Sequence, residues 1–225
     1  MVVVAACVFG VVAVAQASAE PPEFQTPNKK TGEFEALKKK VALTETSGSV
    51  ELRSAGSDLV CTESTGKGDL TGPKTFTSKT TYTGCQDMGV GVTCQSGKKA
   101  GVIKTPTIEG SLVEASAGLG LAPVAAASSP PAITSYTCGT SKYTVTGRVL
   151  GAVTPRGTAT SELAATYAEG VEPEPGCGTQ ELQLIDGLGP CVHLSVQVDS
   201  GPAQPAAMAA VTKKHTKTGH VTLMK

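Results

Sequence analysis

The sequence lacks tryptophan and is poor in aromatic residues, which make up 4% of its 225 residues. Few side chains can stack on bases or sugar rings, so nucleic-acid and carbohydrate binding are disfavoured. An excess of charge is also missing, because nineteen Lys and Arg balance nineteen Asp and Glu. No overall field therefore draws the chain to nucleic acid or to an anionic membrane. Neither G-x-S-x-G nor H-E-x-x-H occurs, so the common hydrolase motifs are absent too.

The beginning of the sequence has the pattern of an export signal. An apolar run over residues 2–15 is followed by small residues at 17–19. This pattern predicts a signal peptide over residues 1–19. The run is shorter than the roughly 20 residues that span a bilayer as a helix, and no later apolar stretch reaches that length. We therefore expect a secreted or cell-envelope protein with no membrane span in its mature chain.

Cysteine usage points to the same compartment. Six cysteines remain after the leader, and an even number in an exported chain predicts three disulfides. Six cysteines allow fifteen pairings, and the sequence alone does not choose among them. Their spacing matches no zinc ligand pair, so we expect no metal and no cofactor. The shortest loops to close favour one set of disulfides, which is Cys85 with Cys94, Cys177 with Cys191, and Cys61 with Cys138.

Most of the mature chain has the pattern of an all-β protein. Breaks rich in Gly, Pro and Thr recur about every ten residues, and the segments between them alternate apolar and polar side chains. The clearest alternation covers residues 142–149 and 192–199, where each segment would bury one face and leave the other in water. The sequence therefore predicts an antiparallel β-sandwich or barrel-like domain over residues 47–225.

Other segments are less regular. Residues 20–46 read as a flexible linker, with a short amphipathic helix over 33–41 because Phe34, Leu37 and Val41 share helical spacing. Residues 161–167 and 203–210 fit helix or strand equally well. A sub-boundary in the stretch 155–176 would divide the β-rich domain in two, although one domain covering both halves is favoured.

Residues of catalytic type cluster in one place. His193, Ser195 and Asp199 lie on one face of a predicted strand. Neighbours two residues apart on a strand are about 6.5–7 Å apart, whereas a nucleophile and its base need about 2.6–3.2 Å. A polar outer face is therefore favoured over a hydrolase site.

A pair of histidines lies near the end of the sequence. His215 and His220 flank a Thr-Gly dipeptide, so a tight hairpin turn would bring the two imidazoles together across strands. A third metal ligand is not evident, and Lys213, Lys214 and Lys217 repel cations. An exposed basic hairpin is therefore favoured over a metal site.

One stretch of motifs resembles a known group of proteins. Cys61 is followed by Thr71-Gly72-Pro73-Lys74 and then by an alternating segment that ends in Thr83-Gly84-Cys85, with Cys94 and Cys138 beyond. Over residues 49–154 this order is similar to that of uncharacterised secreted, β-rich, Cys-containing proteins of actinobacteria. The resemblance implies a secreted β-rich fold and brings no activity, cofactor or functional residue with it.

Together these observations favour a non-catalytic β-domain of the cell exterior or envelope, with a structural or binding role and an extracellular or envelope partner. Two alternatives stay open. One is a secreted hydrolase with a non-standard site around His193. The other is an envelope protein that binds a metal through His215 and His220.

Overall fold

The computed structural model describes residues 23–115, 118–125, 132–147, 149, 151–167, 194–217 and 219–224. These residues form strands and turns and no helix, so the all-β prediction is confirmed. Within the same ranges no helix is long and apolar enough to cross a membrane. The predicted signal peptide, Cys177, Cys191 and His193 lie outside the described residues.

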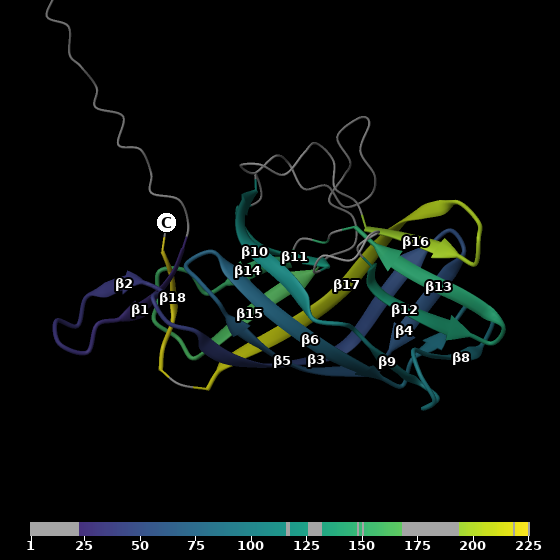
Figure 1. Cartoon of the computed structure of the whole chain (residues 1–225), viewed down its shortest axis with the longest axis horizontal. Coiled ribbons are helices and arrows are strands. Elements are labelled where there is room, and N and C mark those ends of the chain that lie inside the picture. The colour runs from purple at the N-terminus through teal and green to yellow at the C-terminus, as the bar shows by residue number, and fades with distance from the viewer. Residues whose placement is uncertain are drawn as a thin grey trace, which may run out of the picture.

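Eight antiparallel strands close into a barrel (Figure 1). Each strand pairs with the next, and the circuit closes where the last strand, β17, pairs with the first, β3. Along the circuit the strands are β3 (Val41–Ser54), β5 (Glu63–Leu70), β6 (Thr75–Thr83), β10 (Ile108–Ala115), β11 (Gly118–Ala125), β14 (Gly151–Thr154), β15 (Glu162–Tyr167) and β17 (Ala203–Thr216).

Strands β3 and β17 are long enough to take part in a second circuit. Each has 14 residues, and they pair with each other along most of that length. On its other edge β3 pairs first with β5 and then, from Val50, with a different strand. The second circuit runs from β3 back to β17 through β4 (Ser57–Cys61), β7 (Gln86–Asp87), β8 (Val92–Gln95), β12 (Ala132–Cys138), β13 (Ser141–Thr146) and β16 (Leu194–Val198). Strand β9 (Val102–Lys104) adds to the edge of β6.

The alternating segments form the strands that their pattern predicts. Tyr143 and Val145 of β13, and Leu194 and Val196 of β16, are buried. The two ambiguous segments both form strands: residues 162–167 are β15, and residues 203–210 lie within β17. Strands β14 and β15 pair across residue 155, so the described strands on both sides of the predicted sub-boundary belong to one barrel.

The prediction of a helix over 33–41 is wrong, and most of the expected linker is ordered sheet. Strand β1 (Glu23–Pro27) pairs with β2 (Phe34–Ala36) on one edge and with β18 (Thr222–Met224) on the other. This small sheet covers one end of the barrel, at the left in Figure 1. Phe34 and Leu37 share helical spacing, but Phe34 is exposed, whereas Leu37 is buried in the barrel end together with Phe24 of β1.

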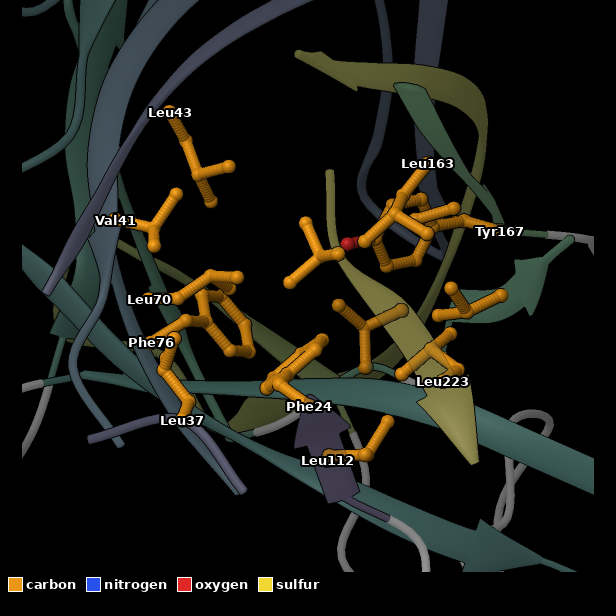
Figure 2. Close-up of a cluster of buried hydrophobic side chains, with 14 of the residues drawn as sticks. Phe24, Leu37, Val41, Leu43, Leu70, Phe76, Leu112, Leu163, Tyr167 and Leu223 are labelled. Carbon is orange, nitrogen blue, oxygen red and sulfur yellow. The ribbon is translucent and has the colours of Figure 1, made fainter. Parts of the chain in front are cut away.

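The interior divides into two apolar clusters. The first, which we call the capped end, gathers Phe24, Leu223 and the side chains of the eight-stranded barrel around Phe76 and Leu112. Figure 2 shows Phe24 of β1 lying between Phe76 and Leu223. The second, the disulfide end, lies within the second circuit. Its apolar members are Leu52, Leu59, Ile103, Tyr136, Tyr143, Val145, Leu194, Val196 and Ala206, together with the four described cysteines.

The four described cysteines form two disulfides, but not the pairs that short loops favour. Cys61 bonds to Cys85, and Cys94 bonds to Cys138. Cys85 and Cys94 are adjacent, since the Cys94 amide donates to the Cys85 carbonyl at 3.0 Å. Strand register nevertheless places Cys94 directly opposite Cys138. The predicted pairs Cys85–Cys94 and Cys61–Cys138 are therefore wrong, because the sheet, not loop length, decides which sulfurs meet.

Candidate ligand-binding cavity

A cavity of about 100 Å³ lies where the two clusters meet. Its wall takes residues from both ends of the molecule, together with Tyr82 and Met208, which pack against both clusters. The wall is mainly apolar, with hydroxyls and one pair of charges. The lining includes the apolar residues Val50, Leu52, Leu59, Phe76, Ile103, Ile108, Val145 and Leu194, the polar residues Ser78, Thr80, Tyr167 and Thr212, and the charged residues Glu45 and Lys214.

The charges belong to a buried ion pair. Glu45 of β3 and Lys214 of β17 are directly opposite each other in the strand ladder, and both side chains point inward. Each side chain is only 4% exposed. Lys214 Nζ donates a hydrogen bond to Glu45 Oε1 and lies 5.4 Å from the centre of the Phe76 ring. Because removing charges from water is costly, each of the two charges is compensated by the other.

Hydroxyl groups hold the second oxygen of the carboxylate. Ser78 Oγ donates to Glu45 Oε2 at 2.8 Å, and Thr80 Oγ1 approaches the same oxygen at 3.4 Å. Both residues come from β6, on the far side of β5. Gly66 of β5 lies between them, and a Cβ there would be 3.1 Å from the same oxygen. The glycine thus leaves space in which Glu45 reaches the hydroxyls.

Lys214 keeps unused hydrogen-bonding capacity. An ammonium group has three N–H donors. Among the residues that the structure describes, one of these donors has a hydrogen-bond acceptor, which is Glu45 Oε1. Buried donors without acceptors cost free energy. The cavity wall therefore contains a cation that can still donate to an oxygen atom placed in the cavity.

Two tyrosines add neutral hydroxyls to the wall. Burial, and next the negative charge of Glu45, raise the pKa of Tyr82 to about 12. The pKa of Tyr167 is raised by the same two causes in the same order. Both side chains therefore stay protonated at ordinary pH. Gly151 leaves the space that the Tyr167 ring occupies, since a Cβ at Gly151 would be 2.7 Å from the ring.

The described part of the His193 cluster has a structural role. Ser195 lies within β16, between Thr146 and Pro205 of the neighbouring strands. Asp199 occupies the following turn at a φ of 49°. Its Oδ1 accepts from the Lys142 amide at 2.8 Å, and its own amide donates to the Lys142 carbonyl at 2.7 Å. These bonds join the turn after β16 to the start of β13, and neither Ser195 nor Asp199 lines the cavity.

The predicted pair of histidines lies at the barrel surface, where His220 is exposed and His215 is half-buried. His215 Nδ1 lies 3.5 Å from Glu162 Oε2, and Lys213 Nζ lies 3.3 Å from the other oxygen of that carboxylate. In the described ranges no group of three or more His, Cys, Asp and Glu could hold a metal ion. The expectation of an exposed basic hairpin fails at one residue, because Lys214 is buried against Glu45.

Sequence reasoning missed both charges of the cavity. One signal could have found Glu45, which follows Val41 and Leu43 on the inward parity of its strand. A carboxylate at an apolar position predicts a buried partner. The helix predicted over residues 33–41 concealed that alternation. Lys214 has no comparable signal, because it lies within a run of basic residues that suggests a solvated surface.

The comparisons with known proteins add no relative. The chain matches no family model, and no curated protein and no solved structure is significantly similar to it.

Proposed function

We propose that this protein is an exported, non-catalytic binding protein whose barrel holds a small, mainly apolar ligand with one oxygen atom. The observation that carries the proposal is the cavity at the junction of the two clusters, with the incompletely bonded Lys214 in its wall. Apolar walls with a few polar groups are typical of ligand sites. Two disulfides and a leader-like N-terminal sequence support the exported location.

The cavity sets the size of the ligand. Its volume of about 100 Å³ compares with about 150 Å³ for an apolar protein cavity that takes benzene. The ligand is therefore no larger than benzene. The apolar wall favours a short hydrocarbon group, and Lys214 favours a hydroxyl or carbonyl oxygen as the polar atom.

Straight-chain alcohols test this proposal. We expect ethanol to hexanol to shift the methyl NMR signals of Ile103 and Met208, which line the cavity. Each added methylene should tighten binding about fourfold until the cavity is full, because burying a methylene group is worth about 0.8 kcal/mol. Binding that does not depend on chain length, or shifts that occur only at the surface, would refute a site in the cavity.

A matched pair of variants provides the control. Val145→Phe fills the cavity, because Val145 is buried in its wall, and should weaken binding of the longest alcohols first. Val211→Phe makes the same change at a residue that is 51% exposed, and should leave binding unchanged. The smaller substitution Val50→Ile repeats the test if Val145→Phe does not fold.

A further inference from the structure

We propose that Lys214 binds its ligand covalently, by condensing with a small apolar aldehyde in the cavity to form an imine beside Glu45. This inference rests on the proposed function, and it names the carbonyl group as the polar end of the ligand. It assigns Lys214 as the nucleophile and Glu45 as the group that accepts its proton and then balances its charge.

The first argument is the position of the amine. Lys214 is buried and lines the cavity, whereas the other lysines that the structure describes are exposed. Lysine amines that line apolar pockets are the ones that form imines with carbonyl compounds. A ligand in this cavity therefore meets one amine, and it meets that amine away from bulk water.

The second argument is the neighbouring carboxylate. Lys214 Nζ donates a hydrogen bond to Glu45 Oε1, so this carboxylate oxygen is placed to take up the proton that the amine gives up before it attacks. Ser78 and Thr80 hold the other oxygen of Glu45, which fixes the carboxyl group during this transfer. The carboxyl group is then placed to return its proton to the oxygen that leaves.

The reaction balances without any further reactant. The amine nitrogen attacks the carbonyl carbon and forms a C–N bond, which gives a carbinolamine. The carbon–oxygen bond then breaks, and the oxygen leaves with two hydrogens as water. An ammonium and an aldehyde thus give a protonated imine and water, with no change in oxidation state.

The surroundings suit the charged product. The iminium nitrogen retains one N–H, which can donate to the Glu45 carboxylate as the ammonium did. The face of the Phe76 ring, with its centre 5.4 Å from Nζ, attracts a cation as well. The apolar wall excludes the water that would hydrolyse the imine.

Reductive trapping tests the proposal on the full mature chain. Butanal is added with cyanoborohydride, and peptide mass spectrometry locates the butyl groups. We expect Lys214 to be labelled before Lys213, which is its exposed neighbour on the same strand. Butan-1-ol should protect Lys214 and leave labelling of Lys213 unchanged, because it fills the cavity but forms no imine.

Variants separate the amine from the cavity. Lys214→Arg keeps the positive charge and should lose the label at that position, whereas Lys213→Arg should keep the label on Lys214. Glu45→Gln should slow trapping at Lys214. The protection experiment needs no variant, so it decides the matter if Lys214→Arg does not fold.

The outcomes also distinguish this inference from the proposed function. If butan-1-ol binds in the cavity but butanal does not label Lys214 ahead of Lys213, the imine is refuted and the binding function stands. If neither compound enters the cavity, both proposals fail. Labelling of Lys214 that butan-1-ol does not prevent would also refute capture within the cavity.

Discussion

The two ends of the molecule are built from the same kind of strand, but their cores are stabilised differently. The capped end has no disulfide among its described residues and relies on large apolar side chains, with Phe24 and Leu223 inserted by the small sheet. The disulfide end has two cross-links and a stacked pair of rings, Tyr136 and Tyr143, whose centres are 5.1 Å apart. The capped end thus depends on side-chain packing, whereas the disulfide end combines packing with covalent cross-links.

Removing both disulfides is expected to have the largest effect. The bonds close loops with sequence separations of 24 and 44 residues. Loop-closure entropy predicts a loss of about 3–4 kcal/mol of unfolding free energy for each, with Cys94–Cys138 the more valuable bond. Replacing each pair with alanines and measuring urea unfolding gives the two values. A loss below about 1 kcal/mol for both pairs would mean that the disulfide end does not depend on its cross-links.

The stability of the capped end should depend on the side chains that its small sheet inserts. Phe24→Ala removes a fully buried ring and is expected to cost about 3–5 kcal/mol of unfolding free energy. Phe34→Ala is the matched control, because Phe34 lies on the neighbouring strand and is 38% exposed. Its cost should stay within about 0.5 kcal/mol. Equal costs for the two variants would show that the small sheet does not seal the barrel.

A glycine tests how closely the capped end is packed. A Cβ at Gly110 would be 2.2 Å from the Phe76 ring, so the ring or the strand must move. We expect Gly110→Ala to cost about 1–3 kcal/mol in thermal or urea unfolding. Gly48→Ala is the control, because a Cβ there meets nothing within 4 Å. Adding Phe76→Leu to Gly110→Ala should recover part of the loss if the clash with the ring is its cause.

The comparison also explains which parts of the fold the sequence predicts. Strands such as β13 and β16 are predictable because alternation is local and a half-buried strand displays it directly. The helix expected over residues 33–41 fails because Phe34 and Leu37 have helical spacing by coincidence. Their positions are decided by strand β1, which lies elsewhere in the sequence: Phe34 pairs with Pro27, and the Leu37 amide donates to the Phe24 carbonyl.

The register between distant strands explains why the sequence does not predict the disulfide pairs or the candidate site. The partner of Cys94 depends on how β8 aligns with β12, and a shift of one residue would point the sulfur away. The candidate site depends on register even more strongly. Glu45 and Lys214 are 169 residues apart in the sequence and meet because β3 pairs with β17. No local pattern encodes that pairing.

The smallest change in stability per residue is expected at alkaline pH, where the tyrosines ionise. Absorbance of the ionised tyrosines reports on both ends of the molecule. The chain has four tyrosines, and the pKa of each is raised above its usual value of about 10, in every case chiefly by burial. Glu45 adds to the shift only for Tyr82 and Tyr167, whereas Tyr136 and Tyr143 lie near Asp87.

Because the folded protein holds these protons more tightly than the unfolded chain, stability is unaffected below about pH 10 and falls as the pH rises through the folded pKa values. The slope should be about 1.4 kcal/mol per pH unit for each buried tyrosine. Near-ultraviolet absorbance should therefore show little tyrosinate at pH 10.5 until the protein unfolds, and no tryptophan obscures that signal.

Glu45→Gln should lower the pKa of Tyr82 and Tyr167 while leaving the pKa of Tyr136 and Tyr143 unchanged, because only the first two lie in the field of that carboxylate. Half of the tyrosines ionising near pH 10 in the folded wild-type protein would contradict the closed interior at whichever end they belong to.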